Sequence, residues 1–308
     1  MMDSLIVAVV HRALVAGTPL LLGTLGEIVA ERAGILNLGV EGMMAVGAVS
    51  AFTTTFVTGS ILLGVLVAIA AGTFLSLIHA FVSVTLKANQ VVSGLALVMF
   101  GLGLSGLWGK SFIGTPLPTR VHDLKIPLLG DIPYIGKMFF HQDPFLYVAL
   151  ILGVIFWFVL THTRWGIVIR SVGESPAASE SQGIKVSAVQ YVSTMIGGAL
   201  AGLAGAHLSL SYSRAWAEGM TGGRGWIVIA LTIFALWNPL RAYLGAFLFG
   251  GIFVLQYLLQ PLGIPPNILG MLPYLITLIV LVIAVVGKDA RKHAAPAMLG
   301  EPYFGGEG

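Results

Sequence analysis

Five polar side chains that could bind a polar solute stand in segments that otherwise avoid charge. They occur in the stretches "ERAGILNLGVEG" and "ANQVVSG" and are Asn37, Glu41, Asn89, Gln90 and Ser93. Their carboxylate, amide and hydroxyl groups can hydrogen-bond hydroxyls and ring nitrogens, and inside a membrane such groups need a partner or a water-filled cavity. We therefore interpret them as candidates for a substrate pathway. Gln90 shares a helical face with Ser93, and hydrogen bonding between helices is its alternative role.

A structural role is the alternative for Glu41. Asn37 precedes it by four residues, so both share one face if a helix covers 36–57. A carboxylate near a helix start is also stabilised by backbone amides, or by Arg32. Glu31 and Arg32 are expected at the membrane edge, where charge costs little.

No catalytic or metal-binding set accompanies these residues. The chain has no cysteine, and its histidines form no His-x-x-x-His pair and no helical Glu-x-x-His site. It also lacks the G-x-x-x-x-G-K-[ST] run that cradles phosphates. We expect no metal site and no enzymatic activity in this chain. If ATP drives its function, another polypeptide hydrolyses it.

The composition defines the solvent around these residues. Of 308 residues, 57% are hydrophobic and 9% are charged, and the mean hydropathy is +0.94, whereas about a quarter of a soluble domain is charged. The sequence therefore predicts an all-α polytopic membrane protein. The net charge of +3 reflects loop charge on one side of the membrane and not nucleic-acid binding. No basic region precedes the first apolar run, which we expect to be a retained span.

Segments free of Asp, Glu, Lys and Arg predict about nine transmembrane helices (range about 8 to 10) in a single domain over 1–287. The predicted spans are 5–26, 36–57, 61–85, 91–108, 145–162, 189–212, 225–237, 240–259 and 268–286. The seventh is shorter than the roughly 20 residues that a crossing needs. Within the sixth, Gly198 and Gly202 lie four residues apart in "GGALAGLAG", a spacing that lets helix backbones approach closely.

The distribution of Lys and Arg predicts the orientation. Placing the loop at 163–188 and the tail at 288–308 in the cytosol puts nine basic residues inside and six outside, as the positive-inside rule favours. The C-terminus is then cytosolic and the N-terminus outside. The tail is predicted to be disordered. The long outer loop over 109–144 is either a passive cover or a docking surface.

The stretch "SPAASESQG" predicts a short helix in the cytosolic loop. Ser175 is a good N-cap, Pro176 suits the first helical position and Gly183 suits the end. A short capped helix in a loop can fit a groove on a partner protein. A plain surface helix is the alternative.

Four motifs, in this order along the chain, resemble one family. They are "ERAGILNLGVEGMMAVGA", "ANQVVSGLAL", "SVGESPAASESQGI" with "GGALAGLAGAHLSL", and "GRGWIVIALTIFALWNPLRAYLGAFLFGG". Together they are similar to the permease subunits of ABC importers of the branched-chain amino acid/ribose type, and within it to the nucleoside-transport branch. The resemblance runs from about Leu5 to Val286.

The resemblance implies partners. Such a permease pairs with a second, related permease, as a heterodimer, among the lipids of a bacterial inner membrane. Cytosolic ATPase domains bind ATP and magnesium, so no cofactor is expected in this chain, and an extracytoplasmic substrate-binding lipoprotein or protein delivers the cargo. The residues matching the ATPase-coupling element are Gly173, Glu174, Pro176, Ala177, Ala178 and Gly183. The general importer pattern has Glu where Pro176 stands, and its Gly comes one residue earlier than Gly183.

The resemblance favours nucleosides as cargo, moved into the cell by alternating access. Simple sugars and branched-chain amino acids are the alternatives within the family. A nucleoside site needs an aromatic face, which the sequence does not place. An ion-coupled secondary transporter would need more ionisable residues in mid-membrane, and a membrane-embedded enzyme would need a clustered catalytic set, so both fit the sequence less well.

Overall fold

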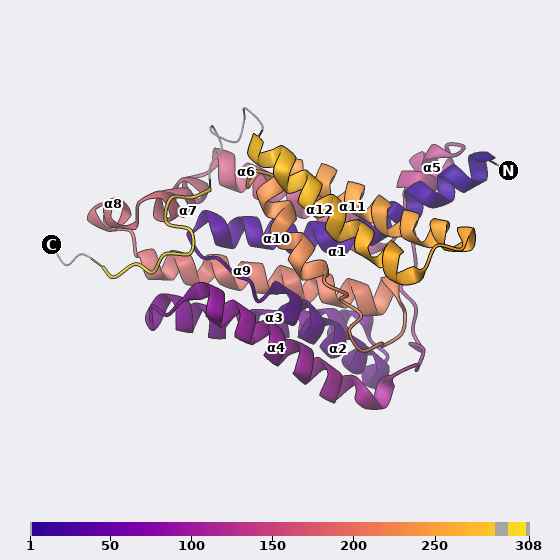
Figure 1. Ribbon diagram of the computed structural model, residues 1–308, viewed down its shortest axis with the longest axis horizontal. Coiled ribbons are helices and arrows are strands. Elements are labelled where there is room, and N and C mark those ends of the chain that lie inside the picture. Colours follow the sequence, from indigo (N-terminus) through magenta and orange to yellow (C-terminus); the bar gives the residue numbers. More distant parts are fainter. Residues whose placement is uncertain (1, 287–294, 306–308) are drawn as a thin grey trace.

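The computed structural model describes residues 2–286 and 295–305, which fold into a bundle of α-helices (Figure 1). The helices are α1 Met2–Arg32, α2 Val40–Thr58, α3 Ile61–Ala80, α4 Gln90–Gly109, α5 Ile135–Phe139, α6 Pro144–His162, α7 Arg164–Glu174, α8 Pro176–Ser181, α9 Val186–His207, α10 Arg224–Phe234, α11 Pro239–Leu259 and α12 Pro266–Val286. Two short strands, β1 Leu124–Lys125 and β2 His141–Gln142, pair antiparallel between α4 and α6. The predicted all-α architecture is confirmed.

Seven helical segments of the described chain are long and apolar enough to cross a membrane. They are Ile6–Arg32, Val40–Thr58, Ile61–Thr85, Gln90–Phe112, Pro144–His162, Val186–Tyr212 and Pro239–Leu262. The other two predicted spans coincide with shorter apolar helices, α10 and residues Asn267–Ile279 of α12. The predicted count of nine is therefore not confirmed. The 11 residues of α10 extend about 16 Å, which is too short to cross hydrocarbon about 30 Å thick.

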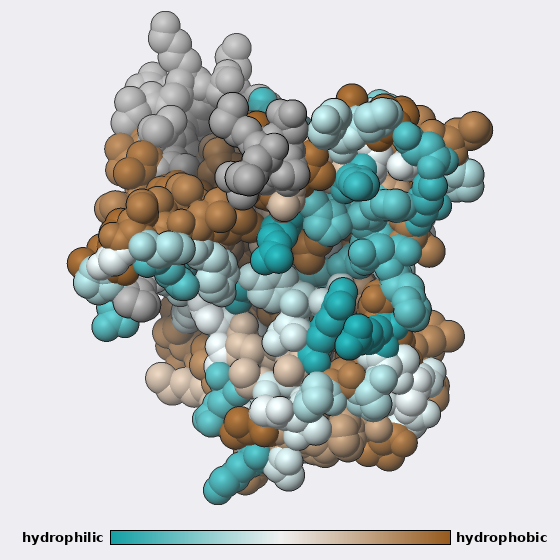
Figure 2. Space-filling view, turned by 90° about the vertical axis from the view of Figure 1, so that its right-hand side faces the viewer, coloured by the Kyte–Doolittle hydropathy of each residue, from teal (hydrophilic) through white to brown (hydrophobic). Residues whose placement is uncertain are grey.

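The span α9 packs against α1, α2 and α3, and α2 also packs against α3. α2 is buried along most of its length, whereas α3 and α6 expose large apolar side chains such as Leu62 and Phe158. Apolar side chains on the outside of a bundle are stable in lipid. Figure 2 looks onto the end of the bundle near α5, where hydrophilic residues gather in the middle of the face and apolar atoms surround them.

Glycines let the central helices approach closely. A Cβ added to Gly202 would overlap the carbonyl oxygen of Ala68 in α3, and one added to Gly47 would lie 2.6 Å from the carbonyl oxygen of Gly202. Gly198 meets Ser76 in the same way. The small residues that the sequence predicts as a packing surface on α9 are therefore at its contacts with α2 and α3.

The two ends of the bundle carry different elements (Figure 1). α7, α8 and the C-terminus lie at one end, named the α8 end, and the N-terminus and α5 lie at the other, named the α5 end. The loop over 109–144 is at the α5 end. It is joined to the segment after α9 by bridges between Ile113 and Trp216 and between Pro116 and Ala215.

The described part of the tail differs from the prediction. The sequence predicts disorder over 288–308, but residues 295–305 lie against the α8 end. The amide of Met298 donates to the carbonyl of Gly173 at 3.0 Å, and the amide of Gly300 donates to the carbonyl of Gly34 at 3.2 Å. Backbone pairing of this kind orders a chain without a large apolar surface, so composition does not reveal it. Residues 287–294 and 306–308 lie outside the described residues.

The close contact at Gly202 can be tested by substitution. Gly202→Val is expected to destabilise the protein by about 1–3 kcal/mol, because the added side chain forces α9 away from α3. A lowered Tm of the purified protein in detergent measures this. Gly103→Val is the matched control, because an added Cβ on that exposed face of α4 meets nothing within 4 Å. Equal melting temperatures for the two variants would contradict the packing.

Candidate functional site

The connection between α1 and α2, residues 33–39, is non-helical and largely buried. Gly34 has a φ of +88°, a left-handed conformation that glycine adopts without strain, and it turns the chain after α1. Ile35 and Asn37 are 1% and 0% exposed. Backbone groups that leave a helix inside a membrane protein need partners from the protein, because lipid supplies none.

Two side chains, one from α3 and one from α4, hydrogen-bond the backbone of Leu36, and a third side chain supports one of them. Its amide donates to Gln90 Oε1 at 2.7 Å, and its carbonyl accepts from His79 Nε2 at 3.1 Å. Because Nε2 then carries the proton, His79 Nδ1 accepts from Ser93 Oγ at 3.0 Å. The structure thus brings the two polar sequence motifs together, with Gln90 and Ser93 arranged around one segment of backbone.

Asn37 belongs to the same connection. Its backbone amide donates to Glu27 Oε1 at 3.1 Å, and its side-chain Oδ1 accepts from the backbone amide of Gly39 at 3.0 Å. Asn37 precedes α2, which begins at Val40, so it does not share a helical face with Glu41 as predicted. Apolar residues fill most of 35–40, and hydropathy alone does not separate this connection from the helix that follows.

Glu41 caps the start of α10. Its Oε1 accepts from the amide of Gly223 at 2.9 Å and its Oε2 from the amide of Gly225 at 2.5 Å, and the residue is 4% exposed. The first amides of a helix have no acceptor within the helix, and this end favours negative charge. The geometry supports the structural alternative for Glu41, with backbone amides and not Arg32 as its partners.

Glu31 and Arg32 bind the segment that follows α10. Glu31 Oε2 accepts from Trp237 Nε1 at 2.5 Å, and Arg32 Nη2 donates to the carbonyl of Leu236 at 3.4 Å. Glu31 is 1% exposed, so its carboxylate lies inside the protein, and its place at the membrane edge stays a prediction. Its partner lies 206 residues away in the sequence, and no local pattern indicates the pair.

Asn89 lies on the outer surface of the bundle. It is exposed and caps α4 by accepting from the amide of Val92 at 3.0 Å. Asn89 and Ser93 line a groove of about 450 Å³ whose other lining residues are apolar. Asn37, Glu41 and Gln90 hydrogen-bond backbone amides, and a pathway role for the five candidates stays a prediction.

A cavity of about 920 Å³ opens at the α5 end, among α1, the end of the sixth span, α11 and the 109–144 loop. Its polar and aromatic lining residues are His11, Arg12, Asp123, Asp143, Ser211, Tyr212, Arg214 and Tyr257. We name it the outer cavity. None of the five predicted pathway residues lines it. Its volume and mixed walls are those of small-molecule sites, which measure about 300–1,000 Å³. In the part of the chain that the structure describes, no three His, Cys, Asp or Glu residues are placed to hold a metal ion.

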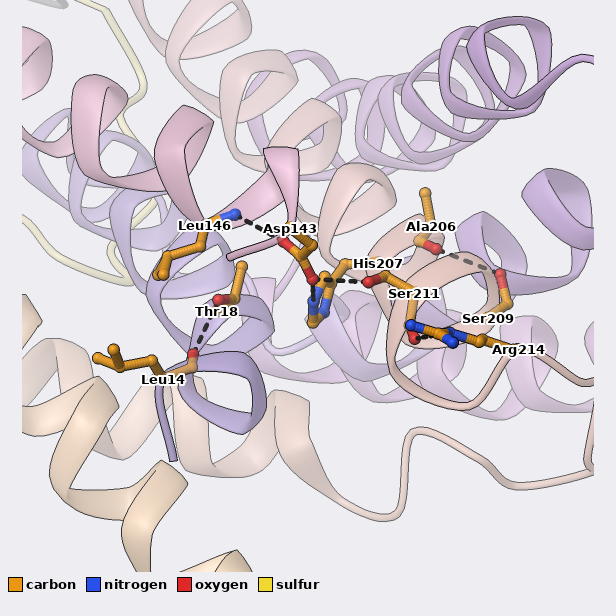
Figure 3. Close-up of polar contacts among 9 residues, drawn as sticks. All are labelled: Leu14, Thr18, Asp143, Leu146, Ala206, His207, Ser209, Ser211 and Arg214. Carbon is orange, nitrogen blue, oxygen red and sulfur yellow. Dashed lines mark hydrogen bonds and ion pairs between the residues drawn. The ribbon is translucent and has the colours of Figure 1, made fainter. Parts of the chain in front are cut away.

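Asp143 anchors one wall of the outer cavity (Figure 3). It is the N-cap of α6, where its Oδ1 accepts from the amide of Leu146 at 2.9 Å. Its Oδ2 accepts from Ser211 Oγ at 2.6 Å and pairs with His207 Nε2 at 3.0 Å. Burial alone would raise the pKa of Asp143, but the imidazole of His207 and the hydrogen bonds outweigh it and lower the pKa to about 2. Asp143 is therefore ionised at neutral pH, and its oxygens act as hydrogen-bond acceptors.

Arg224, at the start of α10, holds an aromatic wall of the outer cavity. Its guanidinium carbon lies 5.2 Å from the ring centre of Tyr212 and 4.6 Å from that of Phe253, distances at which a cation is attracted to a ring face. Its Nη1 also donates to the carbonyls of Met220 and Thr221, both at 3.1 Å. The ring of Tyr212 is thereby fixed beside the cavity.

The predicted short helix is present as α8. Ser175 is its N-cap and accepts from the amide of Ala178 at 3.4 Å, Pro176 occupies the first turn, and Gly183 follows the end with a φ of +79°. Ala177, Ala178 and Gly183 are exposed, whereas Pro176 is buried. α8 therefore presents a small, smooth surface at the α8 end.

The other two predicted coupling residues precede α8. Gly173 is buried against the end of α1, where an added Cβ would overlap the carbonyl oxygen of Arg32. Glu174 is exposed, and its Oε2 accepts from the amide of Ala297 at 3.3 Å. The segment therefore contacts both α1 and the tail.

The fold and these sites define a multi-pass membrane protein with a polar cavity at one end and a capped, exposed helix at the other. The family model described as branched-chain amino acid transport system / permease component matches residues 9–281. The chain belongs to this permease family, and the resemblance of its motifs is confirmed.

Several curated proteins are similar over nearly their whole length. The chain is 40% identical to the putative glucose ABC transporter permease protein TsgC13 of Haloferax volcanii, over 94% of each chain. It is 36% identical to the guanosine ABC transporter permease protein NupQ of Bacillus subtilis, over 97% of each. It is 34% identical to the nucleoside ABC transporter permease protein NupC of Lactococcus lactis, over 93% of this chain and 94% of the relative.

A second guanosine ABC transporter permease protein of Bacillus subtilis, NupP, is 27% identical over 90% of this chain and 83% of its own length. Thus two permeases named for guanosine in one organism both resemble this chain. No solved structure matches the chain.

The cap on α10 gives a prediction for Glu41. Glu41→Gln leaves one acceptor oxygen, so the amide of Gly223 or Gly225 loses its partner at a cost of about 1–3 kcal/mol. We expect a lowered Tm in detergent and less protein in the membrane. Glu218→Gln, at an exposed carboxylate after the sixth span, is the control. A Glu41→Gln variant that assembles and melts normally but loses uptake would identify a pathway residue instead.

Proposed function

We propose that this chain is the transmembrane permease subunit of an ATP-driven ABC importer that moves nucleosides into the cell by alternating access. The observation that carries the proposal is the outer cavity of about 920 Å³. It lies in a chain whose relatives include ABC permeases named for guanosine and for nucleosides, each covering at least 93% of this chain.

The walls of the outer cavity suit a nucleoside. Tyr212 and Tyr257 offer aromatic faces, on which a nucleobase stacks. Asp143 and Ser211 offer oxygens beside them, which can accept hydrogen bonds from ribose hydroxyls. The rings of Tyr212 and Tyr257 are our candidates for the aromatic face, which the sequence does not place.

Glucose is the second candidate cargo. The relative TsgC13, 40% identical to this chain, is named a putative glucose permease. A hexose has the same kind of hydroxyl groups as ribose, so the polar wall suits it as well. The aromatic rings favour the nucleoside, because stacking on a ring contributes to binding a flat base.

The α8 end suits a partner that moves the permease. The exposed residues Ala177, Ala178 and Gly183 form a surface that fits a groove of a cytosolic ABC ATPase. This chain is not the enzyme; ATP and magnesium bind to that partner. ATP drives the cycle only if it binds with different affinity to the two orientations of the pathway.

The remaining partners follow from the family. A second, related permease completes the pathway as a heterodimer, which the two guanosine permeases of Bacillus subtilis support. A substrate-binding protein or lipoprotein delivers cargo to the outer cavity at the α5 end. The α8 end and the C-terminus then lie on the cytosolic side of the membrane.

Uptake assays test the cargo. In cells expressing the importer, Tyr257→Ala is expected to raise KM for a labelled purine nucleoside about ten-fold, since base stacking contributes about 1–3 kcal/mol. Tyr257→Phe keeps the ring and is expected to keep uptake. Glucose uptake that depends on the chain, with no nucleoside uptake, would favour the second candidate. Equal nucleoside uptake by Tyr257→Ala and the unchanged chain would contradict a stacking role.

A bulky residue at Gly183 tests the coupling surface. Gly183→Trp is expected to leave the permease in the membrane and ATP hydrolysis by its partner active, while uptake falls to background, because the ring blocks close seating of α8. Gly59→Trp is the matched control. Gly59 also has a positive φ, +71°, and open space around it, but its carbonyl binds Thr119 of the outer loop. Normal uptake by Gly183→Trp would place the contact elsewhere.

A further inference from the structure

The described tail crosses the α8 end and joins two segments far apart in the sequence. The amide of Met298 donates to the carbonyl of Gly173 at 3.0 Å, after α7 has nearly ended. The amide of Gly300 donates to the carbonyl of Gly34 at 3.2 Å, where α1 gives way to its connection with α2. The backbone of the tail therefore ties the α7–α8 segment to the end of α1.

Side chains extend this attachment onto α8 itself. Tyr303 Oη donates to Glu180 Oε2 at 2.5 Å, and Glu180 is in α8. The Nζ of Lys87, in the turn between α3 and α4, lies 5.0 Å from the ring centre of Phe304. The two aromatic residues of the tail thus engage α8 on one side and a turn of the bundle on the other.

α8 needs such support from outside. It has six residues, and helices of this length are not stable by themselves. Its exposed residues do not pack into the hydrophobic core, so they add little to its stability. Gly173, which precedes α8, packs directly on the carbonyl of Arg32 at the end of α1. A movement of α8 therefore reaches α1 through this contact, as long as the α7–α8 segment stays fixed relative to α1.

We propose that residues 295–305 are a strap that positions α8 against α1 and stays in place throughout transport, so that movement of α8 is passed to the bundle. The proposal rests on the proposed ABC importer function, and it assigns the tail a positioning role in coupling. No part of it requires the tail to touch the cargo or ATP.

Truncation tests the strap in the assembled importer. In proteoliposomes containing all subunits, a chain lacking 295–308 is expected to retain ATP hydrolysis, while cargo transported per ATP falls about five-fold or more, as expected when hydrogen bonds that hold a segment are lost. A chain lacking only 306–308 is the control. Unchanged coupling in the 295–308 truncation overturns the strap while leaving the importer function intact. Absence of ATP-dependent uptake by the full chain would instead contradict the proposed function.

A cross-link between the tail and α8 tests the strap without truncation, in case the truncated chain fails to assemble. The chain has no cysteine, so Glu180→Cys with Tyr303→Cys gives a unique pair for a short bismaleimide, and mass spectrometry measures the cross-linked fraction. The strap predicts that the double variant loses coupling before cross-linking and regains it afterwards, whereas a purely stabilising tail would change protein yield and Tm without changing cargo per ATP. Loss of uptake on cross-linking, with ATP hydrolysis preserved, shows that the tail must detach and overturns the proposal.

Discussion

The rest of the structure depends on the hydrogen-bonding needs of the buried, non-helical backbone between α1 and α2. Lipid offers no hydrogen bonds, so every amide and carbonyl of such a stretch has to find a partner in the protein. Glu27, Gln90 and His79 provide these partners from three different helices. Three of the polar residues that stand out in the sequence, Asn37, Gln90 and Ser93, thus lie where the backbone leaves its helix. The hydrogen bonds there join the connection to α1, α3 and α4.

The same constraint recurs at α10 and shapes the outer cavity indirectly. Glu41 satisfies the first amides of α10, which lets this short helix begin inside the bundle. That position brings Arg224 beside Tyr212, and Tyr212 is a wall of the cavity. A carboxylate that contacts no cavity residue therefore helps to place an aromatic face that does. The residues that cap α10 and a residue that lines the cavity are thus joined through α10.

Features that depend on neighbouring residues, such as spans and helix caps, could be predicted from the sequence. Hydrogen bonds between residues far apart in the chain could not. Hydropathy gives the long spans, and the cap, proline and glycine around α8 give that helix almost to the residue. The partners of Asp143 lie 64 and 68 residues away, and those of Glu41 lie 182 and 184 residues away, so no periodicity reports them. The one local signal for Asp143 is the Asp-Pro pair that it forms with Pro144, which is typical of a helix start and indicates an N-cap. The order of 295–305 depends on backbone bonds, which composition does not record.

The long helix α1 connects the two functional ends in a single element. His11 and Arg12 line the outer cavity, and Arg32, about 30 Å further along the axis, bears on Gly173. A tilt of about 5° at one end of such a lever displaces the other by roughly 3 Å. Pro19 lies between them and removes the helical hydrogen bond to the carbonyl of Val15, itself a cavity residue. The missing bond lowers the resistance of α1 to bending beside the cavity, and a bend there would change the angle between the cavity end of α1 and the end that contacts Gly173.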